Sequence, residues 1–218
     1  MRALILLAGP ELPHPALLRA AKSADLLIAA DAGAAHALWL GRRPEVWLGD
    51  FDSADPELKG LLEGVEIKAF PREKDATDAE LAVAFARERG AKELLLVGAL
   101  GGELDHSLLN LTLGVRLFEE GINALLSGGG EWAFPLLPPG RALPLSEGDA
   151  FSVVPLSPLS GLVIRGAKYE LAGAEVGFGR GWTLRNRARG RVEIGLSSGR
   201  AVVIARPKRG FCPWRKGP

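Results

Sequence analysis

The 218-residue chain exceeds one domain of modal size and is long enough to bury a sizeable core, which favours one domain plus a smaller one. With 47% hydrophobic residues, 24% charged residues and a net charge of +1, its composition is that of a globular protein and excludes a disordered one. One cysteine excludes an internal disulfide, and the short apolar runs predict no membrane span, so we expect the protein in the cytoplasm without a membrane partner.

The first part of the chain alternates between short β-rich runs and segments with helical spacing of apolar residues. The predicted strands are residues 3–7, 26–30, 46–48, 66–69, 94–97 and 123–126. The predicted helices are residues 16–22, 34–40, 56–62, 78–89 and 107–119. Thr77 and Glu80 match a capping box, which places Asp78 in the first turn of the fourth helix. The alternation predicts an α/β fold with a mostly parallel sheet.

The composition changes at the Ser-Gly-Gly-Gly segment of residues 127–130. Beyond it, Pro and Gly separate short β-rich runs, at residues 151–154, 162–165, 192–196 and 201–205. This pattern predicts a small all-β sandwich domain. We therefore expect an α/β domain at residues 1–127 and a β-sandwich at residues 128–218.

Aspartates follow the predicted strands of the first domain. Six of the nine lie in loops or at helix starts after strands, namely Asp31, Asp50, Asp52, Asp75, Asp78 and Asp105. The carboxyl ends of parallel strands form the ligand crevice of such folds. Because like charges repel, a carboxylate cluster at this edge indicates a compensating cation. Hard oxygen ligands that share a metal with phosphates suit Mg²⁺.

Each motif also has an ordinary structural interpretation. An isolated Asp-x-Asp such as Asp50-Phe51-Asp52 is usually turn chemistry, although alternate side chains of an extended segment point the same way. Asp78 alone could complement the helix dipole, and His106 could cap a helix or hydrogen-bond rather than act in a site. Repetition at successive strand ends favours the functional interpretation.

Two further features suit a phosphate. Lys74 places a cation beside Asp75 and Asp78, and Gly101 and Gly102 belong to a glycine-rich loop that lets backbone N–H groups approach a phosphate. The sequence contains neither a P-loop nor a Gly-x-Gly-x-x-Gly motif, so the common nucleotide signatures do not explain the aspartates.

Four segments resemble, in order and spacing, the motifs of the thiamin pyrophosphokinase family. They are Ala-Asp-Ala-Gly-Ala at 30–34, Gly-Asp-Phe-Asp-Ser at 49–53, Lys-Asp-Ala-Thr-Asp at 74–78, and Gly-Gly-Glu-Leu-Asp-His-Ser-Leu-Leu-Asn at 101–110. The likeness continues at residues 166–171, which are similar to the family's Gly-Leu-Lys-Tyr-Pro-Leu, and at Asn186. It thus covers most of the chain.

The resemblance implies a reaction and its parts. Pyrophosphate would pass from ATP to the hydroxyl of thiamin, giving thiamin diphosphate and AMP, with Mg²⁺ as cofactor. The first domain would be catalytic and bind ATP and metal, the second would bind thiamin, and a homodimer would build the thiamin site from both subunits.

The resemblance also implies residue roles. Asp50, Asp52 and Asp78 would be metal ligands and catalytic, with Asp105 also catalytic. ATP and its phosphates would be bound by Asp31, Lys74, Asp75, Gly101, Gly102 and His106. Tyr169 and Asn186 would bind thiamin, since an aromatic face attracts the cationic thiazolium and an amide can pair with the pyrimidine edge.

The sequence departs from the family pattern at three positions. Ala32 replaces the second residue of Asp-Gly-Gly, Glu103 replaces an Arg, and Arg185 replaces a Ser. Glu103 removes a cation where phosphates are expected, which leaves compensation to Arg72 or to the partner subunit. Arg185 bears on acceptor specificity, because an Arg beside a cationic ring is unfavourable unless it turns away.

Two alternatives remain open at this point. One is a pyrophosphokinase of the same fold that acts on another heterocyclic alcohol, such as a pterin. The other is a nucleic-acid-binding protein, suggested by the basic stretches 180–191 and 208–216. The second leaves the aspartates unexplained, so we expect no nucleic-acid partner.

Overall fold

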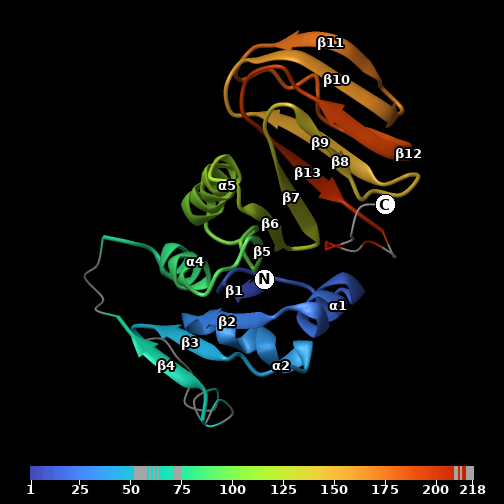
Figure 1. Cartoon of the computed structure of the whole chain (residues 1–218). Helices are drawn as coiled ribbons and strands as arrows, with labels where there is room; N and C mark the ends of the chain where they lie inside the picture. The colour runs from blue at the N-terminus through green and yellow to red at the C-terminus, as the bar shows by residue number, and fades with distance from the viewer. Residues whose placement is uncertain are drawn as a thin grey trace.

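A computed structural model describes residues 1–51, 58, 60, 62, 64–70, 75–208, 211, 213 and 214 (Figure 1). Asp52, Lys74 and Arg72 lie outside the described residues, as does most of the predicted helix at 56–62.

The first part of the chain forms the parallel region of a mixed sheet, in the order β6-β5-β1-β2-β3-β4. Its strands are β1 (Arg2–Leu6), β2 (Leu26–Ala30), β3 (Val46–Gly49), β4 (Glu66–Ala69), β5 (Glu93–Val97) and β6 (Asn123–Gly128). The order brings the carboxyl ends of β1, β2, β3 and β5 to one edge. The predicted α/β arrangement of strands and helices is confirmed for this region.

Helices cover both faces of the parallel strands. They are α1 (Pro15–Ser23), the 3₁₀ helix η1 (Asp31–Ala35), α2 (His36–Leu40), α4 (Asp78–Glu88) and α5 (Leu104–Glu119). Alternate residues of β1 face opposite cores: Leu4 and Leu6 pack with α1 and α2, while Ala3 and Ile5 pack with α4 and α5. Figure 1 shows the two helix pairs on opposite sides of the strands. In the described part of the chain no helix has both the length and the apolarity that a bilayer crossing requires.

Two helix starts differ from the prediction. The segment predicted as one helix at 34–40 begins as the tighter η1, and a side chain at Gly33 would come within 2.4 Å of the Leu6 carbonyl oxygen. Glycine therefore lets η1 pack directly against the end of β1. Helix α5 begins at Leu104 rather than 107, so the Asp-His pair lies inside its first turn.

The second part of the chain is antiparallel. Its strands are β7 (Glu131–Leu136), β8 (Gly140–Leu143), β9 (Ala150–Pro155), β10 (Leu159–Ala167), β11 (Leu171–Val176), β12 (Asn186–Gly195) and β13 (Ala201–Arg206). Strand β7 pairs with β6, so the sheet runs on as β6-β7-β13-β9-β12-β10-β11, and β8 also pairs with β12. The expected boundary at residue 127 falls within β6, and the division into two domains stays a prediction.

The C-terminal residues that are described pack against α1, β1 and β7. The Phe211 ring lies 4.5 Å from the Trp132 ring of β7, and Arg19 of α1 donates a hydrogen bond to the Phe211 carbonyl. Trp214 is also buried, beneath the guanidinium of Arg2. These contacts connect α1, β1 and β7.

Candidate active site

A cavity of about 450 Å³ lies at the carboxyl ends of β1, β2 and β5. Its walls are the loop after β1, Asp31 after β2, the turn after β5, and the first turns of α4 and α5. This is the edge at which parallel α/β sheets bind ligands.

Carboxylates crowd one wall of this cavity. The pKa of Asp31 is raised to about 6, first because the group is partly buried, then because it hydrogen-bonds to the Asp78 carboxyl and feels its negative charge. Asp50 raises it further, whereas a hydrogen bond from the Phe51 N–H, 3.3 Å from Asp31 Oδ1, lowers it. Three acids from three different loops therefore lie close together, as expected from their positions after the predicted strands.

Gly49 makes room for this cluster. A side chain there would lie 1.7 Å from Asp31 Oδ1, and its φ of 153° is a conformation that favours glycine. The Asp31 carboxylate can therefore approach the end of β3, where Asp50 follows. Asp31 itself has a positive φ of 43°, and its carbonyl accepts a 3.0 Å hydrogen bond from Trp47 Nε1.

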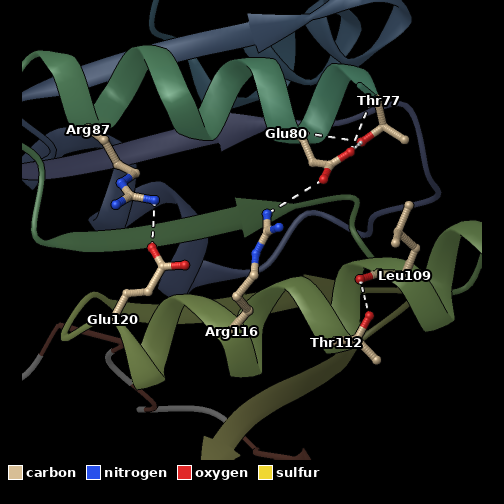
Figure 2. Close-up of polar contacts among 7 residues, drawn as sticks. All are labelled: Thr77, Glu80, Arg87, Leu109, Thr112, Arg116 and Glu120. Carbon is tan, nitrogen blue, oxygen red and sulfur yellow. Dashed lines mark hydrogen bonds and ion pairs between the residues drawn. The ribbon is translucent and has the colours of Figure 1, made fainter. Parts of the chain in front are cut away.

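The first turn of α4 is fixed by the predicted capping box, which the structure confirms (Figure 2). Glu80 Oε2 accepts hydrogen bonds from the Thr77 backbone N–H and hydroxyl, each at 3.1 Å, while its Oε1 lies 3.5 Å from Arg116 of α5. Arg87 and Glu120 form a second ion pair between the helices, at 2.6 Å. These contacts hold Asp78 at the cavity and connect the two helices that wall it.

The first turns of α5 contribute Glu103, His106 and Asn110, which lie three to four residues apart on one side of the helix. Asn110 is buried, and its Nδ2 donates a 2.9 Å hydrogen bond to the Ala99 carbonyl of the turn after β5. His106 Nε2 lies 3.7 Å from Glu103. Asp105 is exposed and lies outside the cavity lining. Its carboxylate accepts a 2.8 Å hydrogen bond from the His106 backbone N–H.

Glycine turns form the floor of the cavity. A side chain at Gly9 would lie 2.2 Å from the Gly98 carbonyl oxygen, so the loops after β1 and β5 touch backbone to backbone. Pro10 lies against Gly101 and Gly102, where added Cβ atoms would come within 3.4 and 3.5 Å of its ring. Backbone this close to a cavity can approach a ligand without side chains in between.

The residues present fit a divalent cation better at the strand ends than at the helix start. Asp31, Asp50 and Asp78 are hard oxygen donors, and burial together with the charges of Asp78 and Asp50 raises the pKa of Asp31, which a cation would offset. A second group whose ligand atoms lie within 4.8 Å, Glu103 with Asp105 and His106, is exposed to solvent.

A second cavity, of about 530 Å³, lies in the antiparallel half and includes Tyr169, Trp182 and Asn186 in its lining. Asn186 is buried and its amide is largely occupied: Oδ1 accepts from the backbone N–H groups of Tyr169 (3.0 Å) and Arg187 (2.9 Å), and Nδ2 donates to the Tyr169 carbonyl at 2.7 Å. Asn186 thus holds the turn that presents the half-exposed ring of Tyr169.

The cavity at the strand ends brings together four of the predicted residues, Asp31, Asp78, Gly102 and His106, and Asp50 adjoins Asp31. Asp75, Gly101 and Asp105 lie outside its lining. Tyr169 and Asn186 share the second cavity. Asp52 and Lys74 lie outside the described residues, and the roles assigned to all of these residues stay predictions.

Sequence reasoning did not assign a role to several lining residues, namely Gly9, Pro10, Ser107 and Asn110. Two signals could have found them. Gly9-Pro10 directly follows the first strand, at the edge where the aspartates also lie. Asn110 lies one helical turn beyond His106 and Ser107, on the polar side of an otherwise apolar helix.

Fold and cavity together define an α/β protein whose ligand site lies where its parallel strands end. A family model described as the catalytic domain of thiamin pyrophosphokinase matches residues 17–126, half of the chain. The chain therefore belongs to the thiamin pyrophosphokinase family.

Curated relatives carry the same name. Over 111 residues the chain is 32% identical to the thiamine pyrophosphokinase of Bacillus subtilis, covering 50% of this chain and 52% of that protein. Over 79 residues it is 35% identical to thiamine pyrophosphokinase 1 of Oryza sativa subsp. japonica, covering 33% of this chain and 30% of that protein. The chain thus aligns with about half of the first relative's length and less than a third of the second's.

Solved structures extend the likeness to the whole fold. The crystal structure of the Bacillus subtilis thiamine pyrophosphokinase is similar with a TM-score of 0.84 at 22% identity, covering 95% of this chain and all of that one. The thiamin pyrophosphokinase of Geobacillus thermodenitrificans gives a TM-score of 0.79 at 26% identity, covering 97% of this chain and all of that one. Both antiparallel and parallel halves therefore belong to the shared fold.

Proposed function

We propose that this protein transfers the terminal pyrophosphate of ATP to the hydroxyl of thiamin, giving thiamin diphosphate and AMP. Family membership supports the reaction. The observation that carries it is the pair Asp31 and Asp78, which line a cavity beside glycine turns and have Asp50 next to them. A carboxylate cluster beside accessible backbone suits a ligand that brings both phosphates and a cation. We expect the reaction to run in the cytoplasm, because ATP is supplied in that compartment.

The residues that would hold Mg²⁺ are Asp50 and Asp78 with Asp31 beside them, together with Asp52 outside the described residues. A bound Mg²⁺ would neutralise charge on the phosphate oxygens. The chain's own contribution is to position the two substrates: the loops after β1 and β5 and the first turns of α4 and α5 surround the ATP end.

The reaction balances with these groups. The thiamin hydroxyl oxygen forms a bond to the β-phosphorus of ATP, the bond between that phosphorus and the α,β-bridging oxygen breaks, and AMP leaves with the bridging oxygen. The hydroxyl proton passes to a carboxylate of the cluster. Attack and departure lie in line, so catalysis rests on orientation and charge stabilisation.

Thiamin recognition is proposed for the second cavity. Tyr169 offers a ring that is 57% exposed, which suits a cationic heterocycle, and Lys168 lies 4.9 Å from that ring. Asn186, whose amide holds the Tyr169 backbone, acts here mainly by fixing the ring's position.

We further propose that the active unit is a homodimer. Among the described residues the two cavities share no lining residue, and this supports a site in which one chain supplies the ATP end and its partner the thiamin end. Exposed apolar side chains lie near both, with Leu104 and Leu108 on α5 and Phe178, Trp182 and Leu184 in the antiparallel half. A two-fold dimer would bury both sets and complete two equal sites.

An AMP-release assay tests the reaction. Purified protein is incubated with ATP and Mg²⁺ and with thiamin, a pterin alcohol or no acceptor, and both AMP and thiamin diphosphate are measured. We expect both products only with thiamin, and their loss in Asp78→Asn. Activity with the pterin alone would keep the chemistry and replace the substrate. No AMP with any acceptor from folded protein would overturn the proposal.

Mixing two inactive variants tests the shared site. Asp78→Asn lacks the metal cluster and Tyr169→Ala lacks the thiamin ring, so a mixed dimer would retain one intact site. Statistical exchange between two-fold dimers predicts recovery of about a quarter of wild-type activity. If mixing and subunit exchange restore no activity, each chain builds its site alone or the dimer does not form.

A further inference from the structure

We propose that His36, held by Trp39, is a positioning residue that fixes the loop after β1 against the turn after β5 and so sets the floor of the ATP cavity. The role rests on the proposed function, because it concerns the binding of ATP in that cavity. His36 is not part of the cavity lining but contacts Gly9, which is.

Both ring nitrogens of His36 have partners. Nε2 lies 3.0 Å from the Gly9 carbonyl oxygen, and Nδ1 lies 3.3 Å from Trp39 Nε1. An indole nitrogen can only donate, so Nδ1 must accept and be unprotonated. A carbonyl oxygen can only accept, so Nε2 must carry the proton. Trp39 therefore selects the one neutral tautomer that can hold Gly9.

The same nitrogen lies beside the second glycine turn. A side chain at Gly98 would come within 3.0 Å of His36 Nε2, and one at Gly9 would collide with the Gly98 carbonyl oxygen. His36 thus lies next to both glycines where they touch. The Trp39 ring packs edge-on against the imidazole, with centroids 6.0 Å apart, and restricts its rotation.

The other end of the loop is held independently. The Gly129 N–H donates to the Pro10 carbonyl at 3.0 Å, and the buried Ser127 hydroxyl donates to Glu11 at 2.6 Å. With these contacts on the β6–β7 side, the hydrogen bond from His36 is the side-chain contact that fixes Gly9 from α2. Its loss should loosen the loop at the cavity without unfolding the chain.

The first test compares variants at His36. His36→Leu removes both nitrogens, whereas His36→Gln keeps an N–H donor near the position of Nε2. Loss of one hydrogen bond predicts a rise of about 3- to 10-fold in KM for ATP in His36→Leu, with a smaller change in kcat. His36→Gln should recover part of the affinity. A merely destabilised enzyme would lose active fraction and hence kcat, with KM unchanged.

His14→Leu is the matched control. His14 is also half-buried, and its Nδ1 also binds backbone, 3.1 Å from the Ala16 N–H, but it caps α1 away from the cavity lining. We expect its KM for ATP to stay at the wild-type value even if its melting temperature falls. Equal KM values for His36→Leu and His14→Leu would overturn the proposal.

The second test needs no activity. In ligand-free protein at alkaline pH, nitrogen NMR of the His36 ring should show a proton on Nε2, and Trp39→Phe should bring the second tautomer into the spectrum. A proton on Nδ1 in the wild type would overturn the proposal. Because this result does not depend on turnover, it stands apart from the assay: wild-type protein without AMP release would contradict the proposed function alone.

Discussion

Carboxylates that are shielded from solvent have different neighbours in the two halves of the molecule. In the parallel half, partial burial together with the neighbouring Asp78 and Asp50 raises the pKa of Asp31 to about 6. In the antiparallel half, the buried Asp149 accepts hydrogen bonds from the backbone N–H groups of Ser146 and Lys208, each at 2.8 Å. Backbone donors thus face Asp149, whereas other carboxylates face Asp31.

This difference separates a structural role from a functional one. A carboxylate paired with backbone donors stabilises the turn that it joins. A carboxylate whose ionisation is opposed by burial and by neighbouring carboxylates costs stability that a bound cation can return. Replacing one carboxylate by an amide should therefore change the stability in opposite directions in the two halves.

Asp78→Asn should have the largest effect. Removal of a cluster carboxylate predicts a loss of about 10²- to 10³-fold in kcat, as for other groups that stabilise developing charge. The metal-free variant should nevertheless melt at a higher temperature than wild type at a pH above about 6, where Asp31 is ionised in the wild type. Below that pH Asp31 is protonated, so the gain should shrink. Melting curves on both sides of pH 6, with and without Mg²⁺, measure the gain in melting temperature and its dependence on pH.

Asp149→Asn is the contrasting substitution for that experiment. An amide cannot accept from both backbone donors, so the variant should lose about 1–3 kcal/mol of unfolding free energy while keeping its activity when folded. A wild-type melting temperature for Asp149→Asn, or a lowered one for metal-free Asp78→Asn, would remove the contrast between the halves.

Gly49→Ala should have the next largest effect on activity. Its Cβ would lie 1.7 Å from Asp31 Oδ1, so Asp31 must move out of the cluster, and activity should fall about 10-fold or more for a misplaced group of this kind. Gly190→Ala is a close control, because Gly190 has nearly the same φ, 154° against 153°, and open space around its Cβ position. Both should lose about 1–3 kcal/mol from backbone strain, but only Gly49→Ala should lose turnover. Similar activities would show that Asp31 tolerates displacement.

The difference between the two halves also explains which parts of the fold and the site could be predicted from the sequence. In the parallel half, strand periodicity placed Asp31, Asp50 and Asp78 at one edge, because the carboxyl ends of parallel strands meet there. Thr77 and Glu80 predicted the start of α4 because a capping box is a local signal. Local patterns and strand order were sufficient for this part of the site.

The remaining features depend on tertiary contacts. The backbone contact of Gly9 with Gly98 arises only when β1 and β5 pair, and they are separated by about ninety residues of sequence. Asn186 resembles a ligand-binding amide in sequence, yet its partners are the backbone groups of Arg187 and of Tyr169, which lies in the turn between β10 and β11. Continuation of the sheet from β6 into β7 likewise follows from pairing across residues 129–130, which composition alone marked as a boundary.

Asn186→Ala should destabilise the antiparallel half. The amide makes three hydrogen bonds to backbone groups, and their loss predicts about 2–3 kcal/mol of unfolding free energy. KM for thiamin should rise because the Tyr169 ring is no longer fixed, while KM for ATP stays constant. Tyr169→Phe keeps the ring and should leave stability unchanged. A rise in both KM values would place Asn186 near the ATP cavity instead.

The smallest expected effects on stability concern Glu80 and Arg116, which form an ion pair between α4 and α5. Glu80→Ala removes the capping box beside Asp78 as well as the ion pair to α5, which predicts a loss of about 1 kcal/mol. Arg116→Ala removes only the 3.5 Å ion pair of an exposed side chain and should cost about 0.5 kcal/mol or less, screened by salt. Denaturant titrations at two salt concentrations separate the terms: the Glu80 effect should persist at high salt because a cap acts through neutral donors, whereas the Arg116 effect should vanish. If both variants lose the same unfolding free energy and both losses shrink at high salt, then the ion pair rather than the capping box orders the start of α4.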